Sequence, residues 1–132
     1  MAKVTEEIKE SMKGAKIAFL STASKDGVPN VAPIGAFKFL DDETLLISDQ
    51  YFLKTLANLK DNPKIALAWW GEKSGFQIKA DVTLHTDGEI FRQNVEWVHS
   101  IRATLSPKTA VVGRITAVYI VKGGPDAGKQ IL

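Results

Sequence analysis

The sequence predicts a mainly β or α+β domain, an antiparallel barrel or closed sheet with helices packed on its outside. Three observations favour this class: about six segments have the composition of strands, tight turns join the first of them, and only three segments have helical periodicity. The strict alternation of strands and helices that is typical of a doubly wound parallel sheet is missing. With 132 residues, 45% of them apolar, the chain is expected to form one domain over residues 1–132.

The first segments predict a short helix and a strand. Val4, Ile8 and Met12 form one apolar stripe, and Gly14 is a plausible end of that helix. Residues 16–23 are rich in strand-forming residues and lead into a turn at Lys25, Asp26 and Gly27.

Residues 28–40 are interpreted as a second strand, which contains Pro29 and Pro33. Because proline cannot donate to a β-ladder, two prolines predict an edge position or a bulge. The third strand is expected at residues 44–48.

Later strands are predicted at residues 64–70, 76–84 and 109–121, and a helix with one apolar face is predicted between residues 90 and 105. In the adjacent pair Trp69–Trp70 one side chain should point into the core and the other outward. Gly113, in the last strand, predicts a bulge or a close backbone approach.

Composition excludes several classes of function. The net charge is +2 without a basic run, so no nucleic-acid partner is expected. The absence of cysteine excludes disulfides, thiol catalysis and thiolate metal sites, and His85 and His99 are too far apart for a helical metal pair. We therefore predict no metal site and no catalytic side chain. No segment resembles a signal peptide or a membrane span, so a cytoplasmic location without membrane contact is expected.

The C-terminal residues 123–129 match the spacing of a phosphate-binding P-loop, but the motif is rejected. Gln130 stands where Ser or Thr is needed, and only two residues follow it, too few for the helix that the motif requires. We expect this tail to lie over the domain surface or to reach a partner subunit.

The most informative segment is residues 48–63, where the pattern predicts the end of a strand followed by a helix that stops at Asn62–Pro63. Lys54 and Thr55 fall in the first turn of that helix, where free backbone N–H groups and the helix dipole favour an anion such as phosphate. Taken alone, the segment is more typical of ordinary surface residues. The role of Gln77 is likewise undecided, because periodicity does not show whether its face of the strand lines a groove or meets solvent.

The order of motifs along the chain resembles the FMN-binding split-barrel family related to pyridoxamine 5′-phosphate oxidase, in particular its short single-domain members. The resemblance rests on IAFLST (17–22), DGVP (26–29), VAP (31–33), LISD (46–49), KTLANL (54–59), NPKIAL (62–67), GFQIK (75–79) and GPDAGK (124–129). It implies a six-stranded antiparallel split β-barrel with flanking helices that forms a homodimer, with FMN at the subunit interface.

The resemblance also implies roles for single residues. Lys54 and Thr55 would bind the FMN phosphate, and Gln77 would reach the ribityl or phosphate region. Val31, Ala32 and Pro33 would line the flavin ring or the ribityl chain. N–H and C=O groups of Ile47, Ser48 and Asp49 would meet the edge of the ring. The partner subunit would cover the flavin with Trp97 or the tail. The arginine and histidine clusters of full-length pyridoxamine phosphate oxidases are not evident here, so that activity is not expected, and Lys54 is the only cation that the sequence places well for the phosphate.

Two kinds of function follow. The first is an FMN-dependent oxidoreductase or electron carrier, with a small molecule or a protein as its unidentified redox partner. The second is a non-enzymatic binding module on the same barrel: a flavin sensor, a deazaflavin binder, or a heme binder with His85 or His99 as axial ligand. A barrel that has lost its ligand and serves only for dimerisation is a third possibility, which an intact Lys54–Thr55 pair disfavours.

Overall fold

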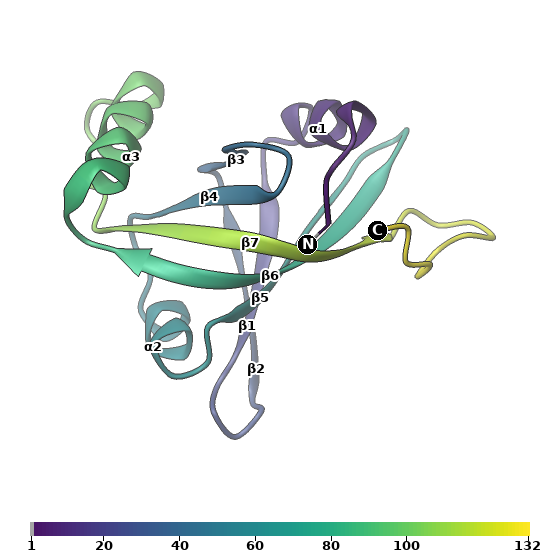
Figure 1. Ribbon diagram of the computed structural model, residues 1–132, viewed down its shortest axis with the longest axis horizontal. Helices are drawn as coiled ribbons and strands as arrows, with labels where there is room; N and C mark the ends of the chain where they lie inside the picture. The colour runs from purple at the N-terminus through teal and green to yellow at the C-terminus, as the bar shows by residue number, and fades with distance from the viewer. Residues whose placement is uncertain (1) are drawn as a thin grey trace.

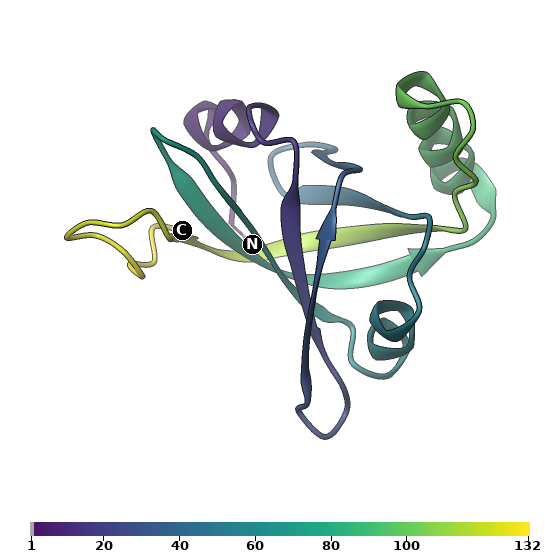
Figure 2. The same ribbon diagram turned by 180° about the vertical axis from the view of Figure 1, so that it is seen from behind.

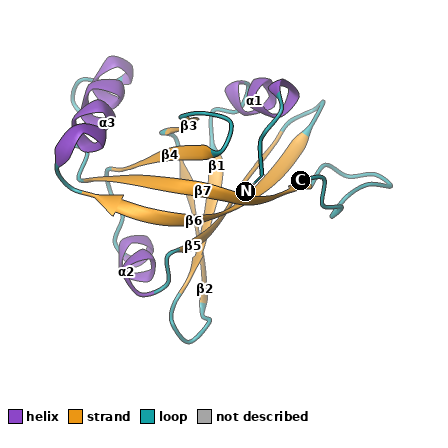
Figure 3. Ribbon diagram, viewed as in Figure 1, coloured by secondary structure: helices purple, strands orange, loops and turns teal. Residues whose placement is uncertain are grey.

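The structure is a computed structural model that describes residues 2–132 (Figure 1). The helices lie around one curved sheet (Figure 3). In chain order the elements are α1 (Glu6–Lys13), β1 (Ala18–Ala23), β2 (Pro29–Ile34), β3 (Phe37–Phe39), β4 (Thr44–Asp49), α2 (Lys54–Asp61), β5 (Lys64–Trp70), β6 (Gly75–His85), α3 (Gly88–Ile101) and β7 (Thr109–Ile120).

The sheet has seven strands in the order β2-β1-β5-β6-β7-β4-β3, and all neighbouring strands are antiparallel. β2 and β3 form its two edges, yet only Gly35 and Ala36 connect them. Because three consecutive Cα–Cα steps span at most about 11 Å, the sheet must curl until its edges approach each other. The Ser48 N–H donates to the Ala36 carbonyl at 3.1 Å at this junction. The predicted fold class, an antiparallel closed sheet with outer helices, is confirmed.

The strand count differs from the prediction because residues 28–40 form two strands instead of one. β2 ends at Ile34, and the chain then passes through Gly35 and Ala36 into β3, which pairs with β4. The two prolines lie in β2, which is an edge strand as predicted. Seen from either side, the β1–β2 hairpin crosses the direction of β6 and β7 (Figures 1 and 2).

The core lies inside the curled sheet and under α1. The predicted apolar stripe of α1 is buried, and Trp69 is 2% exposed whereas Trp70 is 71% exposed, as the alternation predicts. The Trp69 Nε1–H donates to Ser11 Oγ of α1 at 2.9 Å, which satisfies its polar group. A Cβ on Gly113 would meet the Ala80 Cβ at 3.2 Å, so the predicted close approach is confirmed.

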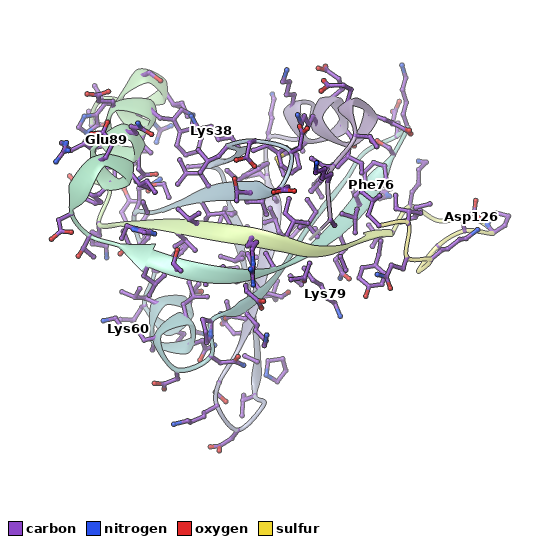
Figure 4. All side chains as sticks on the ribbon, viewed as in Figure 1. Lys38, Lys60, Phe76, Lys79, Glu89 and Asp126 are labelled. Atoms are coloured by element: carbon purple, nitrogen blue, oxygen red, sulfur yellow. The ribbon has the colours of Figure 1, made fainter. Side chains whose placement is uncertain are left out.

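The C-terminal segment leaves the barrel and then returns to it. The C-terminal loop extends away from the barrel, with Asp126 near its outer end (Figure 4). The last residues then return to β7, where the Ile131 N–H donates to the Val118 carbonyl at 2.9 Å. None of the helices in residues 2–132 has the length and apolar character needed to cross a membrane.

Candidate functional site

The site begins where β4 leads into α2. Lys54 is the first residue of this helix, within the first turn where the sequence placed it, and its side chain is exposed. No acidic residue lies in the first turn, and no side chain caps it. Free backbone N–H groups, the positive end of the helix dipole and an ammonium group are therefore concentrated at one point, which favours an anion.

A network of polar side chains ties this helix start to the sheet. The Asn30 amide of β2 donates to Thr55 Oγ1 at 3.0 Å and to Thr22 Oγ1 at 3.2 Å. The Asn58 amide of α2 donates to the same Thr22 oxygen at 3.0 Å. Thr55 is 4% exposed. α2 is thus held against β1 and β2 by hydrogen bonds, and the position of its N-terminus is set by the barrel.

A pocket of about 580 Å³ opens beside this helix start, a volume in the range of small-molecule and cofactor sites. Three segments form its walls: β2 with the following connection, the loop from β4 into α2, and the end of α3. The lining is Asn30, Val31, Ala32, Pro33, Ile34, Gly35, Ala36, Ser48, Gln50, Tyr51, Phe52, Leu53, Lys54, Thr55, Val98, Ile101, Arg102 and Leu105. It contains two cations and no carboxylate, and it is otherwise mostly apolar.

Most of the residues predicted for the site line this pocket, namely Val31, Ala32, Pro33, Ser48, Lys54 and Thr55. Ile47 and Asp49 do not, because both side chains are 0% exposed. The Asp49 carboxylate accepts from the Phe52 N–H at 2.8 Å and from Thr109 Oγ1 at 3.0 Å. Asp49 therefore shapes the loop into α2 instead of facing the pocket with its side chain.

Gln77 and Trp97 also lie outside the pocket of their own chain. Gln77 pairs with Ala68 of β5 and Tyr119 of β7, and it alternates with the buried Phe76 and Ile78. Its side chain therefore faces the outer side of the sheet. The Lys38 ammonium lies over the ring of Trp97 of α3, 4.7 Å from the ring centre. Figure 4 shows Lys38 between β3 and α3.

The sequence did not predict that α3 of the same chain contributes to the pocket. Its helical pattern was extended to Leu105, but α3 ends at Ile101, and Arg102 adopts an extended conformation. The chain then turns so that Arg102 and Leu105 line the pocket together with Val98. Lys54, the one cation that the sequence placed well for a phosphate, is therefore joined in the pocket lining by Arg102.

Folding shifts the pKa of groups outside the pocket. The Lys64 ammonium, 2.8 Å away, lowers the pKa of Asp81 below its usual value. The Glu43 backbone N–H and the Thr44 hydroxyl lower the pKa of Asp41. In residues 2–132 no group of three or more potential metal ligands comes together. The pocket itself combines two cations and a helix start with mostly apolar walls.

The family model for pyridoxamine 5′-phosphate oxidase matches residues 4–122, which is most of the chain. The chain belongs to the pyridoxamine 5′-phosphate oxidase family. It is also 43% identical to an uncharacterized protein from Methanocaldococcus jannaschii, over 99% of this chain and 89% of that protein. The motif order that suggested the family is thus confirmed.

Solved structures of similar fold extend over nearly all of the chain. HupZ of Group A Streptococcus superposes with a TM-score of 0.82 at 23% identity, covering 95% of this chain and 99% of that one. An FMN-binding protein from Syntrophomonas wolfei gives 0.74 at 18% identity, with 90% and 92% covered. HutZ, the heme storage protein from Vibrio cholerae, gives 0.67 at 17% identity, with 89% and 94% covered. Similar folds therefore occur in a protein that binds FMN and in a protein that stores heme.

Proposed function

We propose that the chain is an FMN-binding flavoprotein that works as an oxidoreductase or electron carrier, with its FMN phosphate at the start of α2. The observation that carries the proposal is the uncapped helix start at Lys54, which opens onto a pocket with two cations and no carboxylate. An FMN phosphate carries close to two negative charges at neutral pH, which these groups match.

The residues present fit the rest of the cofactor. Val31, Pro33, Phe52 and Val98 offer apolar walls for a flat ring, and Ser48 offers a polar group at its edge. Bound FMN would supply the electron or hydride transfer, while the protein binds, orients and shields it. Because no histidine, carboxylate or cysteine lines the pocket among the described residues, we assign no acid or base to the chain.

The proposal includes a homodimer. Phe19 and Val31 are 51% and 61% exposed on the outer side of the β1–β2 hairpin, and Tyr51 and Leu53 on the pocket rim are more than 80% exposed. Large apolar side chains at this density mark an association surface. A second copy would cover the open side of the pocket, and it could bring Gln77 or Trp97 to it, which the chain's own fold does not do.

Lys54→Ala tests the placement of the phosphate. We expect it to weaken FMN binding by about 1.5–3 kcal/mol, the scale of a charge-assisted hydrogen bond. Lys60→Ala is the matched control, because Lys60 lies in the last turn of the same helix and outside the pocket lining (Figure 4). Fluorescence quenching of FMN measures both affinities, and equal affinities for the two variants would contradict the placement.

The alternative ligands are separated by titration of the same protein. A heme held by histidine is disfavoured because neither His85 nor His99 lines the pocket. We expect FMN to bind with a shifted flavin spectrum. With hemin we expect no Soret band that depends on histidine. A Soret band that is lost in the His85→Ala or His99→Ala variant would favour the heme binder. A deazaflavin that displaces FMN at lower concentration would favour the deazaflavin carrier instead.

A further inference from the structure

Asn94 is an unusual residue for its position. It lies on α3, it is 0% exposed, and together with Val98 it makes up the whole buried part of that helix. Residues 94 and 98 are one turn apart on the same face of the helix, so an apolar side chain would be expected at residue 94. Asn94 Oδ1 is buried without a hydrogen-bond partner among residues 2–132. Such a group destabilises the fold and calls for an explanation.

The other end of the Asn94 amide leads to the pocket. Its Nδ2–H donates to Ser48 Oγ at 2.9 Å, and the Ser48 hydroxyl in turn donates to Gln50 Oε1. Ser48 and Gln50 both line the pocket, whereas Asn94 stands behind them. The chain of hydrogen bonds therefore has a direction, and it runs from Asn94 outward to Gln50.

This direction decides what the pocket offers to a ligand. The Ser48 oxygen accepts from Asn94, so its single proton is free for Gln50. Because Gln50 uses its oxygen to accept that proton, its Nε2–H₂ group is the free end of the chain. The pocket edge then presents a fixed donor to an acceptor atom such as a carbonyl oxygen of a flat heterocycle.

We propose that Asn94 is a positioning residue for the flavin ring: through Ser48 it holds Gln50 so that its Nε2–H₂ donates to a ring carbonyl oxygen. The inference rests on the proposed function, because it requires that FMN binds in this pocket. Recognition of the flavin ring would then explain why a polar residue is buried at position 94. This role is separate from the phosphate contact at Lys54.

The experiment compares FMN with riboflavin, which has the same ring and lacks the phosphate. Asn94→Leu and Gln50→Ala should each weaken both ligands by the same factor, about three- to tenfold, as expected for one neutral hydrogen bond. They should also shift the absorption maximum of the bound flavin. The double variant should lose no more than Gln50→Ala alone, because both changes interrupt one chain. Lys54→Ala, in contrast, should weaken FMN and leave riboflavin unchanged.

Gln93→Leu is the matched control on the exposed side of the same helix, and it should bind both flavins as the wild type does. Gln50 is only half-buried, so Gln50→Ala keeps the test valid if Asn94→Leu does not fold. Wild-type affinities and an unshifted spectrum in the Gln50→Ala protein would overturn the inference while leaving FMN binding intact. Failure of the wild-type protein to bind either flavin would overturn the proposed function, and the role of Asn94 with it.

Discussion

The hydroxyl of Thr22 is expected to stabilise both the fold and the site, and Thr22→Val tests this. Thr22 is 4% exposed and accepts from the amides of Asn30 and Asn58 at 3.2 and 3.0 Å. Valine keeps the shape of threonine and removes the acceptor. Each amide then loses one hydrogen bond, worth about 1 kcal/mol net. Because both amides are half-buried and water can replace part of the loss, the expected destabilisation is about 1–2 kcal/mol.

Urea unfolding measures this change. With a slope typical of a domain of this size, the midpoint should fall by about 0.5–1 M. Thr22→Ser keeps the hydroxyl and should retain most of the stability. Thr83→Val changes an exposed threonine on β6 and should stay within about 0.5 kcal/mol of the wild type.

The site should respond as well, because Asn30 connects Thr22 to Thr55 at the start of α2. We expect Thr22→Val to weaken FMN binding more than Thr22→Ser does. If the valine and serine variants unfold at the same urea concentration, the network does not contribute to stability, and the reasoning fails.

Three more changes have defined outcomes. Gly113→Ala places a methyl group 3.2 Å from the Cβ of Ala80 on the neighbouring strand. It should lower the free energy of unfolding by about 1–3 kcal/mol, measured as a lower urea midpoint. An unchanged midpoint would show that the strands can separate. Arg102→Ala should weaken FMN binding several-fold in low salt and less in high salt, whereas Arg92→Ala, on α3 and outside the pocket lining, should not. Lys64 lowers the pKa of Asp81 in the folded state. The Asp81 carboxylate therefore stabilises the fold above its unfolded pKa of about 3.9, and this effect is lost as the pH falls through the lower folded pKa. The difference in unfolding free energy between wild type and Asp81→Asn should accordingly shrink toward about pH 2.

Local patterns were sufficient for most elements of the fold. The apolar stripe of α1 predicted its buried face, and the sequence Asn62–Pro63 predicted the end of α2 within one residue. The change of period after β4 placed Lys54 in the first turn of α2, and the helix begins at that residue. Each of these features depends on residues that are close in sequence, so periodicity and capping preferences are enough to find them.

The features that local patterns missed depend on distant partners. Residues 28–40 have strand composition throughout, and only pairing shows that β2 joins β1 while β3 joins β4. In the same way, the spacing of Arg102 in the sequence continues the helical pattern of α3, but the helix ends one residue earlier. Whether a helix continues by one more turn is decided by the contacts available there, which a periodic pattern does not contain.

The pocket consists mainly of places where regular structure ends: the end of β2, the loop after β4 and the end of α3. Patterns identify elements but not which of their ends meet, so the β4–α2 side of the site was predicted and its α3 side was not. One sequence signal for the α3 side does exist. Asn94 is a polar residue four positions before Val98, on the stripe that buries this helix. A polar side chain placed on an apolar stripe at a cost in stability indicates a contact that the isolated helix does not explain, and in this protein that contact leads through Ser48 into the pocket.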